Sequence, residues 1–493
     1  MIDLFAAIER NAAFTPDKPA LRFEGRDLTY AGLASRVRAV AESLARAGVG
    51  RGDRVAVLAE NHPDTLALLY AAARLGAILV PLNWRLADEE LAYALRLADP
   101  KVLAHGPGYA DRAQTLSGGF ARRAMGAGGD LADADDGAPP SDGAADDPCL
   151  LVFTSGTTGR PKGALITQGA LHGNAIQSHH MHQMSAADHI LTVLPLFHVG
   201  GLNIQTTPAL LAGATVTLHA RFHPAATLEA LVDDRPSLTV LVPATLEALL
   251  AEPSFAEADL SSLRAIATGS TIVPEALMEA FEARGIAMLS VYGATETCPI
   301  AAYDRYGTPR VKGGTGRAGV LGTITILGCE GRPLPPGEHG EIGVSGPVFC
   351  GYFRDEAATR ETIVGGIVRT GDIGSLADDG TLTVHDRLKN VIISGGENIY
   401  PAEVERVLKT HPAVADCAVV AEPNARWQEV PCAFVVLRAD AAADDLIAHA
   451  GRALARYKLP RRVVPVQELP RTALGKVRLD LLRAEAKALT EAP

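Results

Sequence analysis

A run of glycine and hydroxyl residues is the part of this chain best suited to chemistry on phosphate. It reads Thr154-Ser155-Gly156-Thr157-Thr158-Gly159-Arg160-Pro161-Lys162-Gly163, and it follows the apolar run 149–153. The glycines let several backbone N–H groups converge on an anion, the hydroxyls add donors, and Lys162 adds a positive charge. It is not a P-loop, because that motif needs adjacent Gly and Lys followed by Ser or Thr. The sequence therefore predicts a phosphate-binding loop after a buried strand.

Further motifs follow this loop along the chain. They read Tyr292-Gly293-Ala294-Thr295-Glu296, Arg369-Thr370-Gly371-Asp372, Asp386-Arg387-Leu388-Lys389, Ser394-Gly395-Gly396-Glu397-Asn398-Ile399-Tyr400-Pro401 and Pro470-Arg471-Thr472-Ala473-Leu474-Gly475-Lys476. In wording and order they resemble the signatures of the acyl-adenylate-forming superfamily, which includes acyl- and aryl-CoA synthetases, luciferases and peptide-synthetase adenylation domains. The motifs span most of the chain, and they resemble most the AMP-forming acyl-CoA synthetase (acid–thiol ligase) branch.

The resemblance implies a two-step reaction. A carboxylate attacks the α-phosphorus of ATP and releases pyrophosphate, and the acyl group then passes to CoA, giving a thioester and AMP. Two anions must meet in the first step, so cations and fixed dipoles must counter their repulsion, where one donor is typically worth roughly 3–4 kcal/mol. By the same resemblance the loop binds the β- and γ-phosphates, Thr295 contacts the α-phosphate, and Glu296 binds Mg²⁺, a hard cation that prefers oxygen ligands.

The resemblance also assigns the nucleotide site. ATP and AMP binding is expected at Thr154, Ser155, Gly156, Thr157, Thr158, Gly159, Lys162, Gly269, Ser270, Tyr292, Gly293, Ala294, Thr295, Asp372, Arg387 and Lys476, and the Mg²⁺ ligands at Glu296 and Thr154. Asp372 follows a predicted strand, and its carboxylate can accept from both hydroxyls of a ribose, assisted by Arg387. The chain departs from the family at 365–368, Gly-Gly-Ile-Val, where relatives usually carry a Trp before Arg-Thr-Gly-Asp, so the local packing must differ.

Catalysis and the second step are assigned in the same way. The expected catalytic residues are Lys476, Thr295, Glu296 and His198. Lys476 resembles the lysine that a mobile C-terminal lid brings to the carboxylate and the α-phosphate, a role suited to a flexible point charge. The lid is expected to rotate about Lys389. Ser394, Gly395 and Gly396 would then enter the site, where the glycines leave a passage for the pantetheine arm of CoA.

The pocket for the acid is the part that the sequence describes least. Resemblance places it at His198, Val199, Gly201, Leu202, Thr268, Gly269 and Tyr292, with His198 beside Phe197 as an aromatic gate. These segments contain no Arg or Lys to pair a second carboxylate, which disfavours a dicarboxylic acid. Small and apolar walls suit a flat aryl group or an acyl chain. We favour an aryl or arylpropenoic acid slightly over a medium-chain fatty acid, because the glycines leave room beside Tyr292 without opening an obvious long tunnel.

Length and patterning predict a multidomain α/β enzyme. The 493 residues exceed what one hydrophobic core normally supports, and short Val/Leu/Ile runs alternate with helical stretches. Strands are expected at 54–58 and 77–80 and a helix at 63–75. The resemblance implies a large N-terminal domain of two doubly wound α/β subdomains plus a distorted β-barrel, with a small mobile α+β lid. We expect the N-terminal domain at 1–385, the hinge at 386–390 and the lid at 391–493.

Charge and composition exclude several other classes. The formal net charge of −11 argues against a nucleic-acid binder. No run is long and apolar enough for a transmembrane segment, and the N-terminus lacks a basic signal-peptide region, so we expect a cytoplasmic protein without an integral membrane segment. Six scattered cysteines predict reduced thiols rather than a zinc site, and His179, His180 and His182 are not expected to bind metal. A homodimer is left open.

Three alternatives also remain open. Only seventeen residues follow Lys476, so no fused carrier domain is expected and free CoA is the expected thiol acceptor. An enzyme that loads a separate carrier protein and a luciferase-like oxidase are alternatives for that step. A non-catalytic nucleotide-binding relative is a third, because a fold alone does not fix function. The joint presence of Lys162, Glu296, Asp372, Arg387 and Lys476 favours the enzyme.

Overall fold

The computed structural model describes residues 4–132, 143–154, 161–271, 273–394, 397–424, 426–471 and 477–491. The chain divides into two compact units. Unit 1 comprises Met1–Thr325, Gly343–Thr370 and Asp379–Leu382, and unit 2 comprises Ile326–Ile342, Gly371–Asp378 and Thr383–Pro493. The expected hinge at 386–390 falls inside unit 2, and the domain limits derived from the sequence stay a prediction.

The larger of the two sheets of unit 1 has nine strands in the order β15-β14-β13-β12-β11-β9-β10-β1-β2. Their bounds are β1 Pro19–Phe23, β2 Arg26–Thr29, β9 His189–Thr192, β10 Thr215–Leu218, β11 Leu238–Val240, β12 Ala265–Gly269, β13 Ala287–Tyr292, β14 Ala302–Tyr303 and β15 Arg317–Ala318. Strands β1, β10, β9, β11, β12 and β13 are parallel. Their carboxyl ends therefore share one edge, where ligands bind in open α/β sheets.

The second sheet has seven strands in the order β18-β8-β7-β4-β3-β5-β6. Their bounds are β3 Arg54–Leu58, β4 Ile78–Leu82, β5 Val102–His105, β6 Ala121–Ala124, β7 Pro148–Thr154, β8 Lys162–Thr167 and β18 Gly351–Tyr352. The inner strands are parallel and nearly continuous in Val, Leu, Ile and Ala, as expected of strands buried on both faces. The strands expected at 54–58 and 77–80 are confirmed to within two residues.

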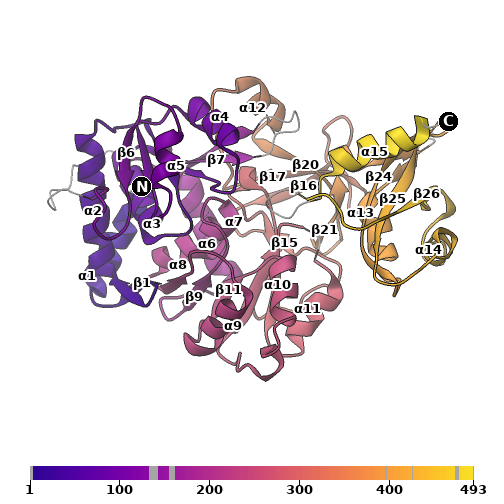
Figure 1. The fold of residues 1–493 in the computed structure, drawn as a ribbon, viewed down its shortest axis with the longest axis horizontal. Helices are drawn as coiled ribbons and strands as arrows, with labels where there is room; N and C mark the ends of the chain where they lie inside the picture. Colours follow the sequence, from indigo (N-terminus) through magenta and orange to yellow (C-terminus); the bar gives the residue numbers. More distant parts are fainter. Residues whose placement is uncertain are drawn as a thin grey trace. The chain divides into compact units, whose positions relative to one another are not determined.

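Helices flank both sheets of unit 1 (Figure 1). They are α1 Leu4–Phe14, α2 Tyr30–Arg46, α3 Pro63–Leu75, α4 Asp88–Ala98, α5 Ala110–Thr115, α6 Gln168–His182, α7 Val199–Gly201, α8 Thr207–Ala212, α9 Pro224–Asp233, α10 Pro243–Leu250, α11 Glu275–Glu282 and α12 Glu356–Thr362, with a π-helix at Leu202–Thr206. Among the described residues, none of the helices is both long and apolar enough to cross a membrane.

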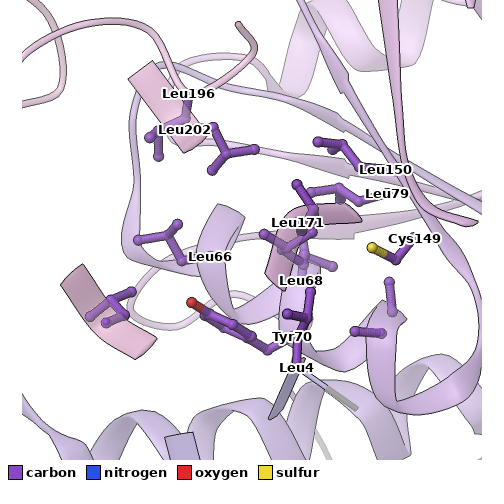
Figure 2. Close-up of a cluster of buried hydrophobic side chains, with 14 of the residues drawn as sticks. Leu4, Leu66, Leu68, Tyr70, Leu79, Cys149, Leu150, Leu171, Leu196 and Leu202 are labelled. Carbon is purple, nitrogen blue, oxygen red and sulfur yellow. The ribbon is translucent and has the colours of Figure 1, made fainter. Parts of the chain in front are cut away.

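Helix α3 shows how the sequence builds this core. It begins with His62 as N-cap and Pro63 in its first turn, and it ends at Gly76 in the left-handed conformation. Leu66, Leu68 and Tyr70 point into the main hydrophobic cluster, which also contains leucines of β4, β7 and α6 (Figure 2). The helix predicted at 63–75 is confirmed.

Two further sheets complete the fold. The first has the order β16-β17-β20-β19 with β21 beside β20, and its residues are divided between the two units. Its bounds are β16 Thr323–Leu327, β17 Gly340–Ser345, β19 Ile363–Val364, β20 Ile367–Leu376 and β21 Leu382–Arg387. The second has the order β23-β22-β25-β24 with β26 beside β25, and consists of β22 Ile392–Ser394, β23 Glu397–Ile399, β24 Val414–Asn424, β25 Gln428–Leu437 and β26 Arg462–Val466.

Successive apolar side chains of β24 and β25 point to opposite faces of the second sheet, so both faces are apolar. Val420 and Phe434 join a cluster with Leu482 of helix α15, Leu479–Glu491, which lies along this sheet in Figure 1. Val419 and Val435 join the opposite cluster, which is completed by helices α13, Pro401–Leu408, and α14, Ala443–Ala450. This is the small α+β domain expected at the C-terminal end, and the mixed α/β fold class is confirmed.

Candidate active site

The predicted phosphate loop is carried by a β-hairpin. Strands β7 and β8 are antiparallel, and Thr154 is the register partner of Lys162. The hydroxyl of Thr154 donates to the carbonyl oxygen of Lys162 at 3.5 Å. Residues 155–160 lie outside the described residues, and with them the predicted Ser155, Gly156, Thr157, Thr158 and Gly159. The structure therefore describes the stem of the loop and the lysine beside it.

Three side chains from distant parts of the chain meet at this stem. The ammonium of Lys162 lies 5.1 Å from the ring centroid of Tyr352, and the Tyr352 hydroxyl donates to Oε1 of Glu296 at 2.7 Å. Burial, assisted by the negative charge of Glu296, raises the pKa of Tyr352, so its hydroxyl remains a donor. The backbone N–H of Phe349 also donates to the Glu296 carbonyl oxygen at 2.9 Å. Lys162 and Glu296, which we predicted separately, are thus joined through one tyrosine.

Tyr352 was not among the predicted site residues. It lies in the two-residue strand β18, and its register partner is Ala164 of β8. Nothing in the local sequence marks it, because only this long-range pairing places it between Lys162 and Glu296. We regard it as a residue that orients Glu296.

The segment after β13 presents Glu296 on a tight turn. Residues Thr295–Thr297 form a single 3-10 turn, and the Ala294 N–H donates to the Thr297 hydroxyl at 2.8 Å. Thr295 is buried and Glu296 is half-buried. A Cβ at Gly293 would lie 1.7 Å from the Pro299 carbonyl oxygen, so only glycine fits there. The predicted Tyr292 ends strand β13 and is buried.

A second set of predicted residues ends the neighbouring strand β12. The Thr268 hydroxyl is fully buried and has no hydrogen-bond partner among the described residues. Buried hydroxyls rarely stay unpaired, so such a group at the carboxyl edge of a parallel sheet is a sign of a ligand site. Ser270 follows with a positive φ of 72° and is exposed.

The segment predicted to line the acyl pocket folds as a short helix that runs into the π-helix. Nδ1 of His198 accepts from the Gly200 N–H at 3.1 Å, so this half-buried histidine caps helix α7. Val199 and Leu202 are buried in the core of unit 1. The π-helix that follows is a rare form that often occurs at functional sites.

The expectation that the pocket glycines make room for the acid is wrong for two of them. A Cβ at Gly201 would lie 2.3 Å from the Pro195 carbonyl oxygen, and one at Gly269 would lie 2.1 Å from the Val291 carbonyl oxygen. Backbone already fills the space that a side chain would occupy. These glycines permit close packing of chain segments and do not open a cavity.

A cation also lies beside the predicted gate. The Arg85 guanidinium is 5.6 Å from the ring centroid of Phe197 and 4.7 Å from that of Trp84, within range of cation–π contact. Arg85 is distant in sequence from the segments predicted to line the pocket, at 195–202, 268–271 and 292. Arg85 comes from the loop after β4, so sequence proximity could not reveal it.

The histidines of α6 have partners of their own. His179 and His180 bond through ring nitrogens to the Pro208 carbonyl and the Tyr303 hydroxyl. His182 is fully buried and lies within hydrogen-bond distance of Ser178 and Gln205. Within the described ranges, no group of three or more His, Cys, Asp or Glu side chains is arranged to hold a metal ion.

Asp372 and Arg387, the residues predicted to bind the ribose, both lie in unit 2. Asp372 is buried in β20, and Nε of Arg387 lies 3.1 Å from its Oδ1. Glu341 accepts from the Gly371 N–H at 3.1 Å, which fixes the backbone just before Asp372. The side chain of Arg387 is 53% exposed, so it can pair with Asp372 and remain accessible to a ligand.

The hinge and the lid are described in part. Lys389 lies in the 3-10 turn Leu388–Asn390, and its carbonyl oxygen accepts from Arg483 of α15 at 3.0 Å. Ser394 is buried at the end of β22. Gly395, Gly396 and Lys476 lie outside the described residues. Arg471 and Val477, the described ends around Lys476, form an antiparallel bridge.

The hairpin stem with its hydroxyl group, the carboxylate joined to a lysine through Tyr352, and the aspartate–arginine pair are chemically suited to a phosphate-bearing ligand. Comparison with known families agrees: residues 8–353 match the AMP-binding enzyme family, and residues 403–476 match the AMP-binding enzyme C-terminal domain. The chain belongs to this family, within the acyl-adenylate-forming superfamily, and the resemblance stated from its motifs is confirmed.

Individual relatives indicate the branch of the superfamily to which the chain belongs. The chain is 46% identical to an indoleacetate–CoA ligase of Aromatoleum aromaticum, over 98% of each chain, and 42% identical to a feruloyl-CoA synthase of an Amycolatopsis species, over 95% of this chain and 96% of the relative. It also resembles the crystal structure of ATP-bound MatB from Rhodopseudomonas palustris, with a TM-score of 0.92, 30% identity and 99% coverage of both chains. The expected enzyme class, an AMP-forming acyl-CoA synthetase, is confirmed.

Proposed function

We propose that this enzyme activates an aromatic carboxylic acid with ATP and transfers it to CoA. The observation that carries the choice of acid is the similarity to two ligases, at 46% and 42% identity, whose named acids both contain an aromatic ring. The Arg85 guanidinium contacts the rings of Trp84 and Phe197, and Phe197 directly precedes the expected gate His198, so aromatic side chains are available near this gate. A medium-chain fatty acid is the second candidate.

The first half-reaction uses the cluster at the hairpin stem. Lys162 offsets phosphate charge, and the expected Mg²⁺ would be held by Glu296 and Thr154. The fit is good, because Mg²⁺ usually keeps several waters and needs only one or two protein carboxylates besides phosphate oxygens. A carboxylate has about four acceptor sites, so the bond from Tyr352 leaves Glu296 able to bind a cation. When bound, the ion neutralises phosphate charge.

Other residues of the chain bind and orient the reactants. Asp372 accepts from the ribose hydroxyls and Arg387 holds its carboxylate in place. The buried hydroxyl of Thr268, which has no hydrogen-bond partner among the residues that the structure describes, offers a hydrogen bond to the acid or the adenylate. Lys476 brings its ammonium to the carboxylate and the α-phosphate, where it stabilises the charge that develops as the bond forms.

The second half-reaction follows a rotation of the lid about Lys389. Lys476 leaves and Ser394, Gly395 and Gly396 line the path of the CoA thiol, which attacks the acyl carbon and releases AMP. The two apolar clusters of the C-terminal sheet consist of residues beyond 391, which suits a lid that moves as one body. A cytoplasmic location and a homodimer stay predictions.

Acid-dependent exchange of labelled pyrophosphate into ATP tests this proposal. The panel comprises indoleacetate, benzoates, cinnamates and fatty acids, each followed by CoA thioester formation. We expect the highest kcat/KM with an aromatic acid. Preference for a fatty acid would overturn the choice of acid, exchange without CoA consumption would favour a carrier-loading enzyme, and no exchange with any acid would favour a non-catalytic nucleotide-binding protein.

A further inference from the structure

Asp386, at the end of β21, is tied to the start of the lid. Its Oδ2 accepts from the Ala402 N–H at 2.8 Å, and its Oδ1 accepts from Nδ2 of Asn390 at 3.1 Å. Ala402 lies in the first turn of α13, where N–H groups lack helical partners and a carboxylate is favourable to the helix dipole. The Asp386 carboxylate is buried, so these bonds are shielded from water.

The ring of His385, the residue before Asp386, makes a second contact between β21 and the start of the lid. His385 stacks on His339 with ring centroids 4.0 Å apart, and Tyr400 lies 5.7 Å from each of them. The Ser375 hydroxyl lies 2.9 Å from Nε2 of His385 and fixes the ring. Two adjacent residues of β21 thus contact the chain at 400–402 through independent interactions.

These contacts cross the expected pivot. His385 and Asp386 precede Lys389, whereas Asn390, Tyr400 and Ala402 follow it. A change in the φ and ψ of Lys389 moves every later residue relative to every earlier one. The bonds of Asp386 to the lid, and the ring contacts of Tyr400, therefore exist in one orientation of the lid and break in another.

Arg483 belongs to the same network but lies entirely beyond the pivot. Its guanidinium donates to the Lys389 carbonyl oxygen at 3.0 Å and to Oδ1 of Asn390 at 2.9 Å. The carbonyl group of Lys389 lies beyond both rotating bonds of that residue, and α15 is part of the lid. The bonds of Arg483 are therefore retained when the lid rotates, whereas those of Asp386 are not.

We propose that Asp386 is a positioning residue that sets the balance between the two orientations of the lid, and so between the two half-reactions. Its bonds to Asn390 and Ala402 stabilise the orientation in which these bonds form, and they are absent from the alternative orientation. Arg483 stiffens the lid side of the pivot without favouring either orientation. The inference rests on the proposed function, in which residues 386–390 are the hinge.

The test measures the two half-reactions separately. Single-turnover pyrophosphate release reports adenylation, and thioester formation from a preformed acyl-adenylate reports the second step. We expect Asp386→Ala to change the ratio of the two rate constants about tenfold, and Asp386→Asn, which keeps one acceptor oxygen, to change it less in the same direction. Asn390→Ala leaves the buried carboxylate in place and should shift the ratio of the two rate constants in the same direction. It provides the test if Asp386→Ala folds poorly.

Arg483→Gln is the matched comparison, and we expect it to leave the ratio within twofold. Arg452→Gln, at an exposed residue following α14, is the surface control. Trypsin cleavage after Arg387 or Lys389 should be faster in Asp386→Ala than in wild type. A ratio unchanged in folded Asp386 and Asn390 variants, or a shift as large in Arg483→Gln, would overturn the inference. A wild-type enzyme that performs only one half-reaction would instead refute the proposed function.

Discussion

The hydroxyl of Tyr352 offers a narrow test of how Glu296 is held. Tyr352→Phe removes one oxygen and leaves the ring in place under Lys162 and edge-on to Phe349, whose centroid is 5.0 Å away. The bond lost is the 2.7 Å donation to Glu296. Hydrogen bonds to charged groups contribute roughly 1.5–3 kcal/mol, so adenylation should fall by about 10-fold to 150-fold in kcat/KM.

The expected loss of adenylation activity in Tyr352→Phe should depend on the Mg²⁺ concentration. If Tyr352 orients Glu296 as a ligand, pyrophosphate exchange in Tyr352→Phe should need a higher Mg²⁺ concentration for half-maximal rate. Thioester formation from preformed acyl-adenylate should stay within twofold of wild type, because pyrophosphate has already left. The assay is therefore a Mg²⁺ titration of both half-reactions at saturating acid.

Tyr303→Phe is the control, since the Tyr303 hydroxyl bonds to His180 and the Val320 N–H rather than to Glu296. It should lower the melting temperature without altering the Mg²⁺ dependence. Unchanged adenylation and Mg²⁺ dependence in Tyr352→Phe would refute the orienting role. An equal loss in both half-reactions would show that the hydroxyl supports the fold instead.

Three further predictions follow from the site and the core. Lys476→Ala should lower adenylation by two or more orders of magnitude and leave thioester formation from preformed adenylate nearly intact; equal losses would reject its role. Lys389→Pro should retain adenylation and lose thioester formation, and activity in both steps would count against the hinge. Burial lowers the pKa of His182 to about 4, so folding requires its neutral form, and roughly 3 kcal/mol of stability present above pH 6.5 should be lost as pH falls to 4. Urea unfolding of wild type and His182→Gln checks this, and equal pH slopes would contradict it.

The sequence predicted the elements whose signals are local. The helical period of the residues at 63–75 predicts helix α3, and short apolar runs predict the strands at 54–58 and 77–80. The motifs around Thr154, Glu296 and Asp372 were likewise visible because each is contiguous. Tyr352 was not, because its place depends on the pairing of β18 with β8.

The acyl pocket was harder for a different physical reason. A glycine can either open space for a ligand or let two backbone segments approach, and composition does not distinguish these cases. Gly201 and Gly269 proved to be of the second kind. Arg85 was missed because it reaches Phe197 from a separate loop.

The two-sided core of the C-terminal sheet bears on how chimeric enzymes should be assembled. Both of its apolar clusters are formed by residues beyond 391, so exchange of this domain between relatives leaves each cluster within one parent. A junction between Lys389 and Asn390 would nevertheless combine Asp386 of one parent with Asn390 and Ala402 of the other. The better crossover point lies before Asp386, so that Asp386 and helix α13, whose first turn it caps, come from the same parent.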